Sequence, residues 1–265
     1  MRLTLGRAGD ATRVRDLAES GPLRLRFPKV REGMPESILV NTAGGIACGD
    51  VFEIDLALEA GAELVFTTTA AEKIYRSDGP VSALRNKIAL GPEARLAWVP
   101  QETILFDRAR LHRTFDADLA PGAALLVAEI VVFGRAAHGE TITDGLFRDV
   151  WRIRREGRLT YADSLRLDGP IGAMLARSAI GGGARAFATI LDLSSRAEAR
   201  LDEARALLDA AGANGASGVE AGASAWNGYL AIRALAAEAG ALRKLVARFL
   251  AAYRGAPMPR VWQSG

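Results

Sequence analysis

The sequence has few of the residues that build disulfides and tight metal sites. In 265 residues it contains one cysteine, Cys48, and two histidines, His112 and His138. A single cysteine excludes a disulfide within the chain, which fits a reducing compartment. The Cys and His spacings typical of zinc sites are absent, and so is the GxSxG elbow of serine hydrolases. Resident zinc and this kind of hydrolase chemistry are therefore not predicted.

Long apolar runs and a strong charge of either sign are also missing. The N-terminus lacks the apolar core of a signal peptide, and no stretch approaches the ~18 apolar residues of a membrane span. The formal net charge is +3, and the arginines are scattered without interleaved aromatic residues. Nucleic acid is therefore not an expected partner. We expect a cytoplasmic protein that binds neither membranes nor nucleic acids.

The first 150 residues have the patterns of β-strands. Residues 52–59 alternate strictly between apolar and polar side chains, which is typical of a half-buried strand. A unit of strand, Gly- or Pro-containing turn, alanine and apolar strand recurs at residues 56–66, 88–98 and 117–127. The alanines after the turns lie 32 residues (62 to 94) and 29 residues (94 to 123) apart: Ala62, Ala94 and Ala123. This recurrence predicts stacked hairpins, each burying the face of its neighbour.

The second half contains two helix patterns. Residues 195–211 carry an apolar face at helical spacing, and Ser195 followed by Glu198 is a capping-box pattern at the start. Residues 238–254 carry a second apolar stripe, and Gly255 follows as a stop signal. These patterns predict two α-helices of roughly 15 residues each.

Together these patterns predict one mainly β domain over residues 1–265. Its stacked or coiled β-sheet layers would be built from the repeated hairpins. The short apolar run at residues 229–235 would return to the sheet as a strand. The two helices of the C-terminal half would pack on one side, since helices segregate to one face of such sheets.

The segment NTAGGIACGD, residues 41–50, contains Gly44, Gly45 and Gly49 between two strand patterns. It lacks the lysine of a phosphate-binding P-loop, so the glycines predict a tight turn with positive φ or close backbone approach. Asp50 could bond the amides of its own loop. Cys48 among small residues is typical of a buried structural cysteine, and it is also a candidate metal ligand.

Four acidic residues near strand ends are the candidates for chemistry: Asp50, Glu129, Glu140 and Asp163. Glu129 interrupts the apolar run 123–133, where a carboxylate must be paired with a cation, protonated or in contact with water. Glu140 follows His138 by two residues, so on a strand both side chains would point to the same side. There they could bind a divalent ion weakly or bond each other.

Six segments in order resemble the urease accessory protein UreD (UreH) family. The similarity extends over nearly the whole chain. The segments are ILVNTAGGIACGD (38–50), LVFTTTAAEKIYRS (64–77), LAWVPQETILFDRA (96–109), GRAAHGE (134–140), GASAWNGYLAIR (222–233) and PMPRVWQ (257–263).

The resemblance implies a β-rich, layered fold and a role in the maturation of urease, a nickel enzyme. Such a protein is a non-catalytic scaffold that docks UreF and the GTPase UreG on the urease apoprotein. It binds no cofactor tightly and passes Ni²⁺ transiently through a hydrated interior. By position, the resemblance places the four acids along this passage. Lys73, Tyr75 and Arg76 are then structural or interface residues.

Two alternatives remain open from the residues alone. A β-repeat carbohydrate hydrolase would use two carboxylates, such as Asp50 and Glu140, on either side of the scissile bond. The 6% aromatic content is low for sugar stacking. A general β-rich interaction module would bind proteins regardless of nickel and of the four acids.

Overall fold

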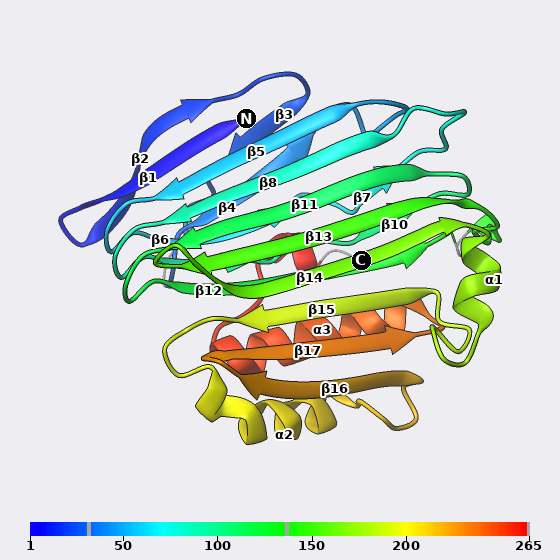
Figure 1. The fold of residues 1–265 in the computed structure, drawn as a ribbon. Helices are drawn as coiled ribbons and strands as arrows, with labels where there is room; N and C mark the ends of the chain where they lie inside the picture. Colours follow the sequence, from blue (N-terminus) through cyan, green and yellow to red (C-terminus); the bar gives the residue numbers. More distant parts are fainter. Residues whose placement is uncertain (31–32, 136–137, 264–265) are drawn as a thin grey trace.

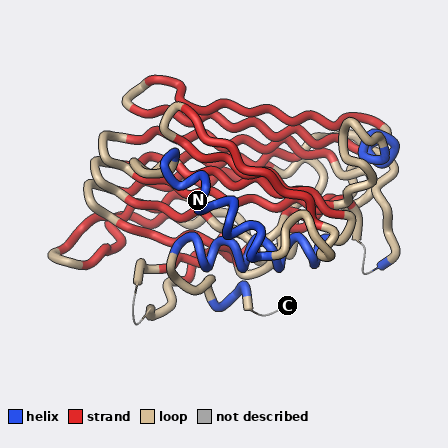
Figure 2. The backbone as a smooth tube through the Cα atoms, turned by 90° about the horizontal axis from the view of Figure 1, so that it is seen from below, coloured by secondary structure: helices blue, strands red, loops and turns tan. Residues whose placement is uncertain are grey.

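The protein has two stacked β-sheets and a layer of helices. The structure is a computed structural model that describes residues 1–30, 33–135 and 138–263. Sheet A packs on one face of sheet B, and helices α2 and α3 cover the other face of sheet B (Figures 1 and 2). The predicted mainly β, layered architecture with helices on one side is therefore confirmed.

Sheet A has the strand order β14-β13-β11-β8-β5-β1-β2. Its strands are β1 (Arg2–Ala8), β2 (Ala11–Ala18), β5 (Val51–Leu58), β8 (Ser82–Leu90), β11 (Arg110–Leu119), β13 (Gly145–Arg155) and β14 (Arg158–Gly169).

Sheet B has the order β16-β17-β15-β12-β9-β6-β4-β3, and β10 and β7 extend it beside β12. Its strands are β3 (Leu23–Arg26), β4 (Glu36–Asn41), β6 (Glu63–Thr68), β7 (Glu72–Ile74), β9 (Arg95–Trp98), β10 (Thr103–Leu105), β12 (Ala124–Phe133), β15 (Ala186–Asp192), β16 (Val219–Trp226) and β17 (Tyr229–Ala236).

The repeated units form the turns of a coil. In sheet A, β5 pairs in parallel with β8, and β8 with β11; in sheet B, β6 pairs with β9, and β9 with β12. Glu63 lies opposite Arg95, and Arg95 opposite Ala124, one position after the aligned alanines. The predicted repeat and its alignment are confirmed. Its description as hairpins is wrong, because the two strands of each unit lie in different sheets and the turn is the corner between them.

Two apolar layers hold the fold together. The larger one fills the space between the sheets and includes the apolar positions predicted for residues 52–59, namely Phe52, Ile54, Leu56 and Leu58, all buried. The second lies between sheet B and the helices. Sheet B is therefore apolar on both faces, which explains the continuous apolar run of β12.

The helices are α1 (Ile171–Ala176), α2 (Leu201–Ala211) and α3 (Ala239–Arg254), with short 3₁₀ segments at Glu198–Arg200 and Arg260–Trp262. The prediction for α3 is confirmed, and Gly255 ends it with a φ of 63°. No helix within the described ranges is both long and apolar enough to cross a bilayer.

The predicted start of the first helix at residue 195 is wrong, because α2 begins at Leu201. The Glu198 carboxylate accepts a hydrogen bond from the backbone N–H of Gly228 at 2.8 Å. It is thus used to hold the β16–β17 turn, and neither the 3₁₀ segment nor α2 has a side-chain cap. Tertiary contacts therefore replace the capping box that the local sequence favours.

Candidate functional site between the sheets

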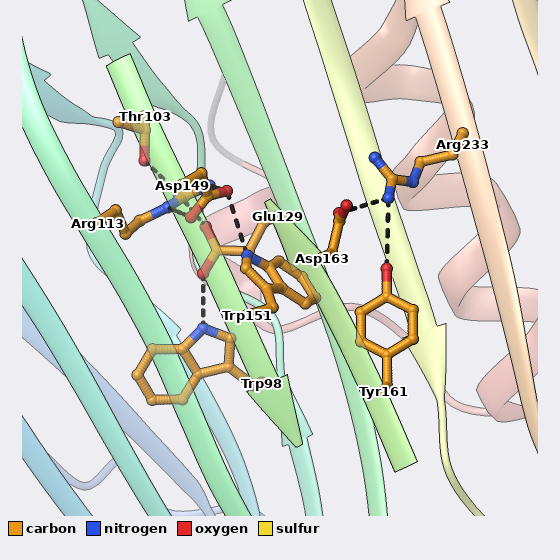
Figure 3. Close-up of polar contacts among 9 residues, drawn as sticks. All are labelled: Trp98, Thr103, Arg113, Glu129, Asp149, Trp151, Tyr161, Asp163 and Arg233. Carbon is orange, nitrogen blue, oxygen red and sulfur yellow. Dashed lines mark hydrogen bonds and ion pairs between the residues drawn. The ribbon is translucent and has the colours of Figure 1, made fainter. Parts of the chain in front are cut away.

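Glu129 is part of a buried polar network that joins the two sheets (Figure 3). Its Oε2 accepts a hydrogen bond from Arg113 Nη1 at 2.5 Å, and its Oε1 accepts one from Trp98 Nε1 at 2.9 Å. Arg113, on β11, also donates to both carboxylate oxygens of Asp149 on β13, at 3.0 and 2.6 Å, and to Thr103 Oγ1 at 3.2 Å. The sequence left three possibilities for Glu129: pairing with a cation, protonation or contact with water. In the structure its carboxylate is paired with Arg113.

The network contains two carboxylates but one guanidinium. Burial raises the pKa of Glu129 and is its largest influence; Arg113 lowers that pKa, and Asp149 raises it further. Burial alone would lower the pKa of Arg113, but the two carboxylates outweigh burial and raise it. With both acids ionised, the three side chains carry one net negative charge. Such a charge in a buried site favours a proton or a second cation.

Glu129 also lines a small cavity between the sheets. The cavity has a volume of about 40 Å³, and Glu72, Asn86 and Thr103 are among its other polar lining residues. Asn86 Oδ1 is buried and has no hydrogen-bond partner among the described residues. A space of this size can hold on the order of one to three water molecules. Carboxylate and amide oxygens thus meet at one internal space.

The second carboxylate at the cavity belongs to Glu72, on β7. Burial raises its pKa to about 6, although the hydrogen bond from Asn41 Nδ2 at 2.9 Å acts in the opposite direction. Both carboxyl groups that line this cavity, those of Glu72 and Glu129, are therefore easier to protonate than in water. Neutral or cation-bound forms are favoured at this site.

Asp163 lies next to this network, on the edge strand β14. In the β13–β14 register it is opposite Trp151, whose Nε1 donates to Asp149 (Figure 3). Asp163 Oδ2 accepts a hydrogen bond at 2.5 Å from Arg233, on β17 of sheet B. The pair ties the edge of sheet A to sheet B, beside Glu129 and Asp149.

The other two predicted acids lie in loops, each with its own partner. Glu140 accepts two hydrogen bonds from the Arg135 guanidinium, at 2.9 and 2.8 Å, and this interaction lowers its pKa. Asp50 accepts the backbone N–H of Ala47 at 2.9 Å, the loop contact considered for it above. Of the four predicted acids, Glu129 belongs to the buried network and Asp163 lies next to it, opposite Trp151, whereas Asp50 and Glu140 lie apart in loops. The passage itself stays a prediction.

The candidate metal ligands Cys48 and His138 are both exposed. The prediction that Cys48 is buried is wrong; its Sγ lies 3.1 Å from Ser77 Oγ. The prediction that His138 and Glu140 share a strand face is also wrong, because the chain turns there; residues 136–137 of this motif lie outside the described residues. No group of three or more His, Cys, Asp or Glu side chains suited to a metal ion occurs in the part of the chain that the structure describes.

The glycines of the 41–50 loop have the predicted role. Gly44 and Gly49 have φ of 76° and 79°, in the left-handed region that favours glycine. A Cβ on Gly45 would lie 2.4 Å from Tyr75 Cε2 and 2.7 Å from the backbone oxygen of Lys73. The loop therefore packs closely on Tyr75, which is consistent with a structural role for that residue. Lys73 and Arg76 are exposed, and their interface role stays a prediction.

Comparison with known proteins identifies the family. A model of the UreD urease accessory protein family matches residues 1–263. The chain belongs to the UreD family. It is 67% identical to urease accessory protein UreD 1 of Methylobacterium radiotolerans over 100% of this chain and 91% of the relative. It is 52% identical to UreD of Xanthobacter autotrophicus, over 99% of this chain and 88% of the relative.

Membership of this family gives the chain a role in urease maturation as an accessory protein, not an enzyme. The carbohydrate hydrolase alternative is therefore excluded. The buried network must accordingly be explained by binding, transport or stability, and not by bond-breaking chemistry.

Sequence analysis missed four polar residues of this UreD-family site: Glu72, Asn86, Arg113 and Asp149. Three of them carry a readable signal, because they occupy apolar positions of alternating strands. Asn86 is in phase with Ile88, for example, and Arg113 with Phe115. The same reasoning that singled out Glu129 would have found them. Glu72 has no such signal, since β7 is three residues long.

Replacement of Glu72 by glutamine is expected to stabilise the protein at neutral pH. The folded state raises the pKa of this carboxyl from 4.5 to about 6, so its ionisation above pH 6 costs about 2 kcal/mol of folding free energy. Below pH 4.5 both states are protonated and the cost disappears. Urea denaturation should show E72Q more stable by about 2 kcal/mol at pH 7.5 and equal to the parent near pH 4. The exposed control E59Q should show no such trend; equal stability of E72Q and the parent at pH 7.5 would contradict the prediction.

Proposed function

We propose that this chain is a urease maturation scaffold that docks UreF and UreG on the urease apoprotein and passes Ni²⁺ through its interior. Family membership supports the role in urease maturation. The resemblance of the motifs supports the partners. The interior between the sheets supports the transfer of the ion, with Glu129 as its central group.

The observation that carries the transfer step is the excess of carboxylates over arginines beside a cavity. Arg113 neutralises one of the two acids that it contacts, Glu129 and Asp149. The cavity adds a third acid, Glu72. A hydrated divalent cation entering this space would meet oxygen ligands and a net negative charge, both of which favour it.

Oxygen ligands also allow the ion to leave. Thiolates and clustered imidazoles hold Ni²⁺ more tightly than carboxylates and water do. The described interior offers carboxylate, amide and hydroxyl oxygens, from Glu72, Glu129, Asn86 and Thr103. The Asp163–Arg233 pair beside Glu129 supplies a further carboxylate towards the edge of sheet A, where the Asp163 side chain is 29% exposed. Asp50 and Glu140 would act nearer the loops.

Replacement of Glu129 by glutamine tests the transfer step. The amide keeps the shape of the side chain but removes the net negative charge of the network. We expect activation of urease apoprotein to fall by about tenfold or more, as happens when the surroundings of a metal path are altered. The nickel content of the recovered urease, measured by mass spectrometry, should fall in parallel, while the complex with UreF and UreG still forms.

The matched control is E53Q. Glu53 is also paired with an arginine, Arg85, at 2.8 Å, but both lie on the outer face of sheet A. This variant should activate urease like the parent. E53Q should unfold at the parental temperature. In E129Q one of the two buried donors, Trp98 Nε1 or Arg113 Nη1, loses its acceptor, so this variant should unfold somewhat below the parental temperature. Assays at a temperature where both variants are folded separate transfer from folding. Parental nickel loading with E129Q would show that Glu129 is not on the route.

A further inference from the structure

The outer face of sheet A is broad and open. The helices pack on sheet B, and Figure 1 shows no helix over the strands from β5 to β14 on this side. Side chains on this face are mostly polar, since alternate residues of each strand point to the core. Charges that are close on this face are set by the register between neighbouring strands.

Most of this face is arranged with opposite charges adjacent. One row across five strands alternates in sign, each residue lying opposite the next: Arg2, Asp55, Lys87, Asp116 and Arg152. Opposite charges facing one another across strands stabilise a sheet, whereas like charges destabilise it. The sequence therefore follows the electrostatic rule in the middle of the face.

A second row breaks that rule. His112 on β11 lies opposite Arg148 on β13, and Arg148 lies opposite Arg166 on β14, at a strand spacing of ~4.8 Å. Arg110 lies two residues before His112 on the same face. We call these four residues the cation cluster. Arg166 is paired with Asp168 at 2.6 Å.

The other three members of the cluster have fewer partners for their charges and hydrogen-bond donors. Within the described ranges, no ion pair is formed by Arg110, His112 or Arg148. The Nε of Arg110 is buried and has no hydrogen-bond partner there. Burial and the three neighbouring arginines lower the pKa of His112, and Asp168, the nearby acid that pairs with Arg166, offsets only part of this effect. The arrangement costs stability in the isolated chain.

We infer that the cation cluster is a docking site for a protein surface with clustered Asp and Glu side chains. In the adjacent alternating row, each basic residue has an acidic residue opposite it on a neighbouring strand. Across the described strands the cation cluster lacks such neighbours, and an acidic partner surface would provide them. The open face of sheet A suits a protein partner of matching extent, and charge complementarity of this kind directs association and orientation. The cluster thus gives up stability in the free chain to gain recognition in a complex. The inference rests on the proposed function only for the choice of natural partner.

Charge reversal at Arg148 tests the inference, with R152E as the matched control. Arg148 and Arg152 are both exposed arginines on the same face of β13, but Arg152 belongs to the alternating row. A fluorescent octaglutamate peptide at low ionic strength is the first probe, because it does not depend on the proposed function. R148E should bind it about tenfold or more weakly than the parent, and R152E within about twofold.

Protein partners form the second arm. Apo-urease, UreF and UreG are each tested for binding to the full chain, and the R148E deficit should appear with one of them. If none binds the parent, the proposed function fails, while the peptide result still decides the cluster. If R148E and the parent bind peptide equally, or if an oligonucleotide is bound more tightly than octaglutamate, the inference is overturned.

Thermal stability separates recognition from structure. R148E replaces like charges opposite His112 and Arg166 by opposite ones, so its melting temperature should rise by about 1–3 °C. R152E breaks a favourable alternation and should not rise. A variant that is more stable yet binds less well is expected only if the cluster serves a partner. A fall in melting temperature for R148E would show that the cluster is structural.

Discussion

Replacement of Arg113 by methionine is expected to lower the free energy of unfolding by about 3–5 kcal/mol, because it leaves two buried carboxylates without their cation. Arg113 has a side chain 2% exposed, and Glu129 and Asp149 are 6% and 8% exposed. Methionine retains the apolar stem but donates no hydrogen bond. Thermal unfolding should show a melting temperature lower by about 10 °C.

The control for this variant is R152M. Arg152 has a side chain 46% exposed and approaches Asp116 at 3.9 Å, so its loss should cost less than about 1 kcal/mol. Adding E129Q to R113M should recover part of the lost stability, since one of the two unpaired charges is then removed. If R113M and R152M unfold at the same temperature, the network contributes little to the fold.

The double variant also separates the two roles of the network. E129Q alone is expected to lose nickel transfer with a smaller loss of stability than R113M, because Arg113 keeps Asp149 as its partner and only one buried donor loses its acceptor. The main effect expected of R113M is a loss of folding stability. The network thus combines a structural ion pair, Arg113–Asp149, with a second carboxylate whose charge is in excess. Within this network, Glu129 is the carboxylate that the proposed transfer route would use.

The coil of the fold follows from patterns that are visible in the sequence. Strict alternation fixes which face of β5 is buried, and the alanines at 62, 94 and 123 mark equivalent corners. Local pattern cannot show the pairing partner, however. A strand–turn–strand unit has the same alternation whether its two strands pair together or pair with units about 30 residues away. The hairpin prediction was wrong for that reason.

Local signals were also misleading where distant contacts dominate. Ser195 and Glu198 favour a helix start, but Glu198 holds the turn at Gly228 and α2 begins six residues later. Residues 238–254, by contrast, carry a complete apolar stripe and are followed by a glycine stop. Here the helix begins and ends where the local pattern predicts. Helix boundaries are predictable where the cap residues have no other partner in the fold.

The site was predictable only in part. Glu129 is conspicuous because it interrupts a continuous apolar strand. Its partners on alternating strands are less conspicuous, since every second residue there is polar and the phase must be known. Arg113 and Asp149 become recognisable once Leu111 and Phe147 are assigned to the core. The pairing of Glu129 with one arginine and one indole depends on the packing of two sheets, which no local pattern contains.

Truncation of Trp262 to alanine is expected to destabilise the protein by about 3–5 kcal/mol, the range for a large buried aromatic side chain. Trp262 lies in the C-terminal 3₁₀ segment and is 6% exposed. Its Nε1 donates to Thr67 Oγ1 and to the backbone oxygen of Val99, both at 3.1 Å, at the ends of β6 and β9. Its backbone oxygen accepts a hydrogen bond from Arg243 of α3 at 3.0 Å. Loss of the side chain therefore leaves a cavity and two unsatisfied acceptors.

The control W226A removes the same side chain from an exposed position. Trp226 is 45% exposed and contacts Tyr229, so its truncation should cost less than about 1 kcal/mol. W262F keeps most of the apolar volume but loses the N–H donor, and its stability should lie between those of W262A and the parent.

Hydrogen exchange should localise the effect of W262A to β6 and β9. Thr67 lies on β6 and Trp98 on β9, so loosening these strands would also shift Trp98. Glu129 would then be disturbed, because it accepts a hydrogen bond from Trp98. If W262A and W226A are equally stable, the C-terminal segment does not hold sheet B, and the proposed route through the interior does not depend on it.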